Sequence, residues 1–163
     1  MKDINFLVVG VGGQGTILAG DILTETGMLA GYDVKKSDVL GLAIRGGSVV
    51  SHVRWGEKVD APMSIPGNVD YLLAFEPLEA LRQIDFLHPE STVITNDYAI
   101  PPVSVSSGQT EYPEPDHIQE VLASHSRKLY HFDATTEAVS LGSVKTVNVL
   151  LLGALSALLD IPE

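Results

Sequence analysis

Cysteine is absent from the 163 residues of this chain. The chain therefore forms no disulfide, and it holds no iron–sulfur cluster through thiolates, which are the usual ligands of such clusters. If electrons pass through an assembly that contains this chain, we expect their carriers to lie in another subunit.

Basic residues are few. The sequence has 10 Lys and Arg against 21 Asp and Glu, which gives a formal net charge of -11. A protein that binds nucleic acid through its phosphates needs many basic side chains, so we exclude nucleic acid as a partner. The acidic balance fits a basic partner, but it is equally typical of ordinary soluble proteins.

Long apolar runs are missing as well. The apolar run at residues 4–9 is too short for the core of a signal peptide. Residues 147–159 are the most hydrophobic segment, and they fall short of the roughly 18 residues that a membrane span needs. We therefore expect a soluble, cytoplasmic protein with no membrane partner, and a length of 163 residues indicates a single domain over 1–163.

Buried strands and helices alternate along most of the chain, which predicts an α/β fold with a Rossmann-like, mostly parallel sheet and helices on both faces. The predicted strands are residues 4–9, 33–39, 71–75, 92–95 and 128–132, and the predicted helices are 16–30, one opened by Pro77, 117–124 and 144–159. Residues 101–115 form a polar, proline-rich loop. The strand at 33–39 is the least typical, because Lys35 and Lys36 lie at its centre.

An antiparallel hairpin is predicted between residues 49 and 65. Apolar and polar residues alternate over 49–55 and again over 59–65, and Gly56-Glu57 lies between the two arms. A protein built only from βαβ units has no such feature. We therefore expect an antiparallel excursion on the parallel sheet.

A glycine-rich loop follows the first strand: Gly10, Gly12 and Gly15 satisfy G-x-G-x-x-G between a buried strand and a helix. Open amides at a helix N-terminus attract anions, so a phosphate of a nucleotide or of coenzyme A would suit this loop. NAD binding also needs an acidic residue after the second strand, and Asp38 is a poor candidate because Lys35 and Lys36 precede it. The same glycines can also serve close helix–strand packing without any ligand.

Four ordered segments resemble one known family, the gamma domain of 2-oxoacid:ferredoxin oxidoreductases. They are Gly10-Val11-Gly12-Gly13-Gln14-Gly15, Arg45-Gly46-Gly47-Ser48, Phe75-Glu76-Pro77-Leu78-Glu79-Ala80-Leu81-Arg82, and the final apolar helix that carries Asn148. The likeness covers nearly the whole chain. Within the family the pattern is most similar to the beta subunit of indolepyruvate:ferredoxin oxidoreductases, in which the gamma-type domain is a separate polypeptide. That family usually continues into a further C-terminal helical segment.

The resemblance implies a small subunit of a heteromeric enzyme that converts a 2-oxoacid, at family level an arylpyruvate, to an acyl-CoA while ferredoxin is reduced. It also implies that thiamine diphosphate and the iron–sulfur clusters belong to a large partner subunit, and that coenzyme A is a possible contact of this chain. The isolated chain would then be inactive. The alternative is a stand-alone nucleotide- or CoA-binding protein with a Rossmann-like fold, and a third possibility is a purely structural module with an empty loop.

The candidate anion-binding residues are Gly10, Gly12, Gly13, Gln14, Gly15, Arg45, Gly46 and Gly47. Arg45 has a fixed charged fork that suits a carboxylate or a phosphate of substrate, CoA or partner, but it could equally hold its own loop by an internal ion pair. No residue is assigned as catalytic.

Several polar residues have both a functional and a structural interpretation. Glu76, Asp97 and Asp133 follow predicted strands, where ligands bind in open sheets, although helix capping or partner contact is the more common role there. Asn148 lies in an otherwise apolar helix and contacts either the glycine loop or another subunit. His52 is expected at the surface, and no metal site is expected because the histidines lack metal-ligand spacing. The apolar final helix and the hairpin favour self-association or pairing with a partner.

Overall fold

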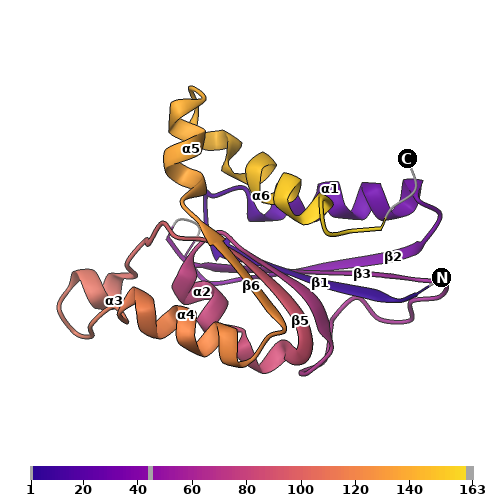
Figure 1. The fold of residues 1–163 in the computed structure, drawn as a ribbon, viewed down its shortest axis with the longest axis horizontal. Helices are drawn as coiled ribbons and strands as arrows, with labels where there is room; N and C mark the ends of the chain where they lie inside the picture. The colour runs from indigo at the N-terminus through magenta and orange to yellow at the C-terminus, as the bar shows by residue number, and fades with distance from the viewer. Residues whose placement is uncertain (1, 44–45, 161–163) are drawn as a thin grey trace.

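A six-stranded sheet forms the centre of the molecule (Figure 1). The structure, a computed structural model, describes residues 2–43 and 46–160. The strand order is β2-β3-β1-β4-β5-β6. The strands are β1 (Ile4–Val11), β2 (Asp33–Leu40), β3 (Ser48–Gly56), β4 (Val69–Ala74), β5 (Leu87–Asn96) and β6 (Lys128–Phe132). β1, β4, β5 and β6 run parallel, whereas β3 runs antiparallel to both β1 and β2.

Helices cover both faces of this sheet, as the sequence predicts. One face carries α1 (Thr16–Leu29), α5 (Ala134–Ser140) and α6 (Val147–Ser156), and the other carries α2 (Pro77–Arg82) and α4 (Pro115–Ser124). A short α3 (Val103–Ser106) and two 3-10 turns, Ile84–Phe86 and Val144–Thr146, lie in the connections. The Rossmann-like class is confirmed, and Pro77 occupies the first turn of its helix as expected.

The side chains of successive strand residues alternate between the two faces, so each face has its own core. Phe6, Trp55 and Phe75 are fully buried under α1, α5 and α6, whereas Leu7 and Leu72 pack beneath α2 and α4. Burial of both sheet faces explains why residues 4–9 are continuously apolar rather than alternating.

The predicted hairpin is half correct. Its first arm is β3, but residues 59–65 form no strand. The partner of β3 is β2, which pairs with it antiparallel from Asp33 opposite Gly56 to Leu40 opposite Val49. Both edges of β3 are therefore occupied, by β1 and by β2, and residues 59–65 have no strand left to pair with.

The charged centre of β2 is tolerated because β2 is an edge strand. Lys36 forms ion pairs with Asp21 and Asp38, each at 2.7 Å.

Two helices also differ from the sequence prediction. α5 is not predicted from the sequence, and the final helix begins at Val147 after a 3-10 turn rather than at Val144.

The segment between β3 and β4 lies against the underside of the sheet, where it meets His52. This histidine is not at the surface as expected but only 2% exposed, and its Nδ1 accepts a hydrogen bond of 3.3 Å from the Ser64 amide. Its ring packs edge-on against Phe86. Burial lowers the pKa of His52 below its ordinary value, and the Asp38 carboxylate opposes that shift.

The close approach of α1 to the sheet depends on Gly27. A methyl group added at Gly27 would lie 2.5 Å from Trp55 Nε1, whereas one added at Gly153 of α6 would meet no atom within 4 Å. We predict that Gly27→Ala lowers the free energy of unfolding by about 1–3 kcal/mol through overpacking. Gly153→Ala, the matched control, should raise it by up to about 1 kcal/mol through helix propensity. Urea denaturation followed by Trp55 fluorescence measures both, and equal effects would contradict this packing.

Stability should also depend on pH through His52. Burial lowers the pKa of this ring in the folded state, whereas the unfolded chain takes up a proton at the ordinary pKa of 6.5. The contribution is therefore present above that value and is lost as the pH falls. His52→Asn, which retains an acceptor for the Ser64 amide but does not titrate, should lose less unfolding free energy than the parent between about pH 7.5 and 5.5. Identical slopes would show that the buried ring does not contribute.

Candidate glycine-loop site at the carboxyl edge of the sheet

Residues 10–15 connect β1 to α1 at the carboxyl edge of the parallel strands. Gly13 and Gly15 have φ values of 100° and 85°, a conformation in which a side chain is strained. At Gly10 an added Cβ would lie 2.6 Å from Thr16 Oγ1, so the glycine allows the helix to begin directly above the strand.

The amides of this loop divide into two groups. The Gly12 amide donates to the Gly47 carbonyl at 2.8 Å, and the Gln14 amide donates to the Val11 carbonyl at 3.1 Å. Within residues 2–43 and 46–160, no backbone carbonyl accepts from the amides of Gly13, Gly15 or Thr16. These open donors lie at the start of a 14-residue helix, whose dipole adds partial positive charge there.

The Gln14 side chain is hydrogen-bonded within the described chain at both of its polar atoms. Its Oε1 accepts from the Val11 amide at 2.7 Å, and its Nε2 donates to the Phe75 carbonyl at 3.0 Å. This amide thus ties the glycine loop to the end of β4, and its anion-binding role stays a prediction.

Asn96, which sequence reasoning missed, completes the same network. It is fully buried at the end of β5, and its Nδ2 donates to both the Phe75 carbonyl and Thr135 Oγ1, each at 3.0 Å. Its Oδ1 has no hydrogen-bond partner among the described residues. An asparagine that follows an apolar strand carries no distinctive sequence signal, because such residues are common in turns.

A cavity of about 350 Å³ opens beside the loop. It is lined by Gly13, Gln14, Gly15, Leu18, Tyr98, Ile100, Thr135, Val144, Lys145, Val147 and Asn148. Among the polar groups of this lining, the Lys145 ammonium has no ion pair and the Asn148 Nδ2 has no hydrogen bond within the described residues. Asn148 is 5% exposed and lies over Gly15, with Nδ2 3.3 Å from the place a Cβ on that glycine would take.

A second cavity, of about 600 Å³, lies on the other side of the loop. Gly12, Thr16 and Val49 are among its lining residues, together with Leu40, Gly41 and Ala43 from the segment that follows β2. Gly46 and Gly47 lie near the end of that segment. Arg45, the predicted anion-binding arginine, is outside the described residues.

Glu76 is not available to a ligand. It is 1% exposed and caps α2, with Oε2 accepting from the Glu79 amide at 2.9 Å. Its Oε1 accepts from the Ile100 amide at 3.2 Å and from the Tyr112 hydroxyl. Burial, together with the hydrogen bond to this carboxylate, raises the pKa of Tyr112. The structure thus supports capping rather than ligand contact, and Asp133 likewise caps α5 through the Thr136 amide at 2.8 Å.

The geometry required for NAD is absent from the described chain because β3 is inserted between β1 and β2. Asp38 on β2 therefore lies two strand spacings, roughly 9–10 Å, from the β1 axis. Its carboxylate is already engaged by Lys36 at 2.7 Å and by Ser51 Oγ at 2.5 Å. An acidic residue placed in this way cannot bind the ribose of a dinucleotide held on the glycine loop.

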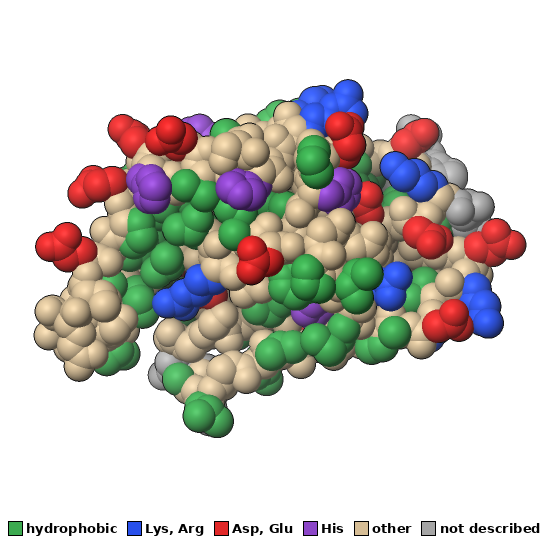
Figure 2. Space-filling view, turned by 90° about the horizontal axis from the view of Figure 1, so that it is seen from below, with side chains coloured by type: hydrophobic (Ala, Val, Ile, Leu, Met, Phe, Trp, Pro, Cys, Tyr) green, Lys and Arg blue, Asp and Glu red, His purple; other side chains and the backbone are tan. Residues whose placement is uncertain are grey.

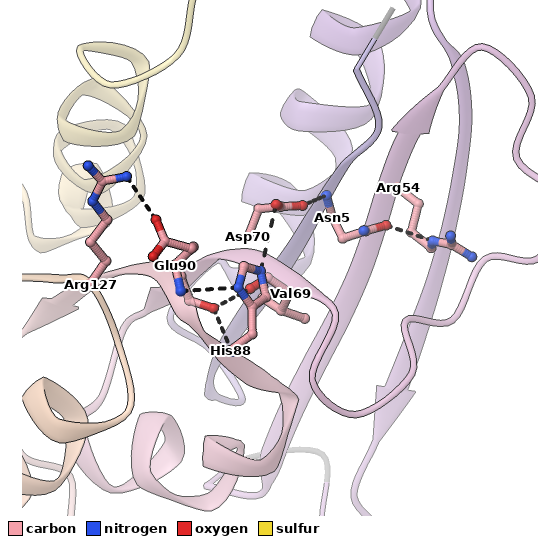
Figure 3. Close-up of polar contacts among 8 residues, drawn as sticks. Asn5, Arg54, Val69, Asp70, His88, Glu90 and Arg127 are labelled. Atoms are coloured by element: carbon pink, nitrogen blue, oxygen red, sulfur yellow. Dashed lines mark hydrogen bonds and ion pairs between the residues drawn. The ribbon is translucent and has the colours of Figure 1, made fainter.

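The opposite, amino-terminal edge of the sheet carries a separate polar cluster (Figure 3). Asp70 accepts from the Asn5 amide at 2.8 Å and lies 3.8 Å from His88, and Arg127 pairs with Glu90 at 2.9 Å. A cavity of about 710 Å³ lies there. None of the glycine motifs lines this cavity.

No group of three or more His, Asp or Glu side chains in the described part of the chain is arranged to hold a metal ion. None of the helices described there is long and apolar enough to cross a membrane.

The fold and the loop together define a Rossmann-like domain with a glycine-rich loop at the carboxyl edge of its parallel strands. Comparison with known proteins identifies the family of this domain. Residues 5–163 match the model of the pyruvate ferredoxin/flavodoxin oxidoreductase family, and the chain belongs to that family.

Two relatives carry the same name, indolepyruvate oxidoreductase subunit IorB. The protein from Thermococcus kodakarensis is 42% identical over 96% of this chain and 78% of its own length. The protein from Archaeoglobus fulgidus is 40% identical over 98% of this chain and 79% of its own length.

Solved structures share the fold. The pyruvate oxidoreductase subunit PORC of Thermotoga maritima superposes with a TM-score of 0.70 at 20% identity, over 100% of this chain and 80% of that one. The 2-oxoglutarate:ferredoxin oxidoreductase of Magnetococcus marinus gives a TM-score of 0.70 at 24% identity, over 100% of this chain and 25% of that one.

The inward hydrogen bonds of Gln14 can be tested by a single atom change. Gln14→Glu replaces the donor to the Phe75 carbonyl with a second acceptor, so we expect the free energy of unfolding to fall by about 1–3 kcal/mol. Gln109→Glu, at an exposed loop position, makes the same change and should have little effect. Chemical denaturation measures the free energy of unfolding of both variants. Equal stability would mean that the Gln14 amide does not hold the loop.

Proposed function

We propose that this chain is the small subunit of a heteromeric 2-oxoacid:ferredoxin oxidoreductase, with indolepyruvate or a related arylpyruvate as the 2-oxoacid. The support is 42% identity to a protein named indolepyruvate oxidoreductase subunit over nearly the whole chain. The complex would release carbon dioxide from the 2-oxoacid, pass two electrons to ferredoxin and transfer the acyl group to coenzyme A.

The proposal assigns the redox chemistry to a large partner subunit. A thiolate-held iron–sulfur cluster does not fit this chain, because the sequence contains no cysteine. We also place thiamine diphosphate in the large subunit, because the family resemblance implies that location. Ferredoxin would contact the assembled complex rather than the isolated small subunit. In this arrangement the assembly is cytoplasmic, and residues 1–163 act as one gamma-type domain.

The role proposed for this chain is to hold coenzyme A by a phosphate at the glycine loop. The amides of Gly13, Gly15 and Thr16 have no backbone acceptor among the described residues and lie at a helix N-terminus, where an anion is favoured. Asn148 and Lys145 add two side-chain donors in the cavity that Gly13 and Gly15 line, whereas Thr16 lines the neighbouring cavity. The observation that carries this proposal is Asn148: a buried amide over Gly15, whose Nδ2 has no acceptor within the described residues.

Exposed apolar side chains offer surface for assembly with the large subunit or with a second copy of this chain. On α1 they include Leu18, Met28 and Leu29, which is 90% exposed, and on α6 Val149. Figure 2, which shows the molecule from below the view of Figure 1, shows further hydrophobic side chains exposed between acidic ones. Met63 and Ile65, from the segment that has no strand to pair with, are also exposed.

The ligand role predicts a specific kinetic effect of Lys145. We expect Lys145→Glu to raise the KM for coenzyme A on the order of tenfold in the complex reconstituted with the large subunit, with kcat changed much less, because it removes a binding charge without touching the redox centres. Lys128→Glu is the matched control: it makes the same charge change at an exposed position on β6.

Turnover at varied coenzyme A and varied small subunit separates the alternatives. A raised requirement for the small subunit in Lys145→Glu would indicate docking rather than ligand binding. Equal kinetics of the Lys145 and Lys128 variants would contradict the ligand role, and turnover by the isolated chain would contradict the assignment as a subunit.

A further inference from the structure

Glu79 is a buried carboxylate whose position does not follow from the helix it occupies. It lies at the third position of α2, three residues after the N-cap Glu76, and it is only 3% exposed. In a capping box, a glutamate at this position bonds back to the N-cap amide. Among the described residues Glu79 has no such bond: one of its oxygens pairs with Arg82 of the same helix, and the other accepts from a residue of the sheet.

Both Glu79 oxygens have partners. Oε2 accepts from Ser48 Oγ at 2.5 Å, and Oε1 accepts from Arg82 Nη1 at 2.6 Å. Ser48 is the first residue of β3 and directly follows the second glycine pair. The carboxylate thus connects α2, on one face of the sheet, to the point at which the segment of residues 41–47 re-enters the sheet.

Ser48 lies beside the contact between the two glycine segments. Its carbonyl accepts from the Gly41 amide at 3.0 Å, and the preceding Gly47 carbonyl accepts from the Gly12 amide at 2.8 Å. A Cβ at Gly47 would lie 2.6 Å from the Ala43 carbonyl oxygen, so Gly47 lies close against Ala43. A displacement of Ser48 would therefore move the carbonyl that holds the Gly12 amide.

Occupied and open amides alternate along the glycine loop: Gly12 donates to the Gly47 carbonyl and Gln14 to the Val11 carbonyl, whereas Gly13 and Gly15 have no backbone acceptor among the described residues. Gly13 and Gly15 line the proposed ligand cavity. Loss of the Gly47 contact would remove one of the two backbone hydrogen bonds that hold the loop, and the open donors would then be less fixed.

We propose that Glu79 is a positioning residue: through Ser48 it fixes the Gly47 carbonyl against the glycine loop and so sets the geometry of the anion-binding amides. This inference rests on the proposed role of the loop in binding coenzyme A. A buried charge costs more to place than a packed apolar side chain, so its retention requires a specific task. Here the task is to fix the end of one strand relative to the loop that follows another.

The test uses the complex reconstituted with the large subunit. Ser48→Ala and Glu79→Leu, which each remove the hydrogen bond between these residues, should each raise the KM for coenzyme A about five- to tenfold while kcat changes less than about twofold, because misaligned donors weaken binding without altering the redox chemistry. Ser48→Thr keeps the hydroxyl and should restore most of the affinity. Ser126→Ala removes a hydroxyl that donates to the Leu122 carbonyl on another part of the surface and serves as the control.

Coupling between the two residues provides a second readout. Because both act through one hydrogen bond, the double variant should raise the KM no further than the stronger single variant. If the fold increase in KM of the double variant equals the product of the two single increases, the proposal is overturned. So would an unchanged KM, or a fall in stability and assembly that Ser48→Thr does not reverse.

The Lys145→Glu complex keeps the two proposals distinguishable. If that variant raises the KM for coenzyme A and the Ser48 and Glu79 variants do not, the positioning role fails and the ligand site stands. If none of the three raises it, both proposals fail.

Discussion

The Phe75 carbonyl lies where β1, β4 and β5 end, and it accepts hydrogen bonds from two side-chain amides, Gln14 Nε2 and Asn96 Nδ2. The next amide bond of the chain leads into α2 through Glu76, whose carboxylate holds the Ile100 amide. One carbonyl group therefore ties the glycine loop to the neighbouring strand end. Buried polar groups of this kind tolerate little displacement, because an unpaired member loses its hydrogen bond without regaining water.

The sequence predicted those features of the fold that depend on local pattern. The buried run of β1, the proline that opens α2 and the glycines before α1 each follow from residue type and spacing, and the structure places all three as expected. The second hairpin arm was wrong because alternation at Val59, Met63 and Ile65 reports only which residues could pair. Whether a partner strand is available depends on the whole sheet, and β2 and β1 occupy both edges of β3.

Some residues of the candidate site could be located from the sequence, and others could not. The glycine loop could be located from its motif, and Asn148 from its position in an apolar helix. The inward turn of Gln14 and the contact of Glu79 with Ser48 could not be located, since each joins residues that are distant in sequence through a side chain with several rotamers. A motif specifies which residues recur near a site, but it does not say which of them face the ligand and which hold the backbone.

The insertion of β3 between β1 and β2 also constrains the order in which the chain can fold. β2 contacts the rest of the sheet only through β3, although it leaves the ribosome first. β1 and β2 therefore cannot join the native sheet until β3, which begins with Ser48 opposite Val11, has been added between them. This non-local closure has to occur before the edge strand gains any support, and contacts so distant in sequence slow folding. A nascent chain that ends before β3 has two strands with no neighbour, and it depends on the rapid arrival of the next residues to avoid pairing with other chains.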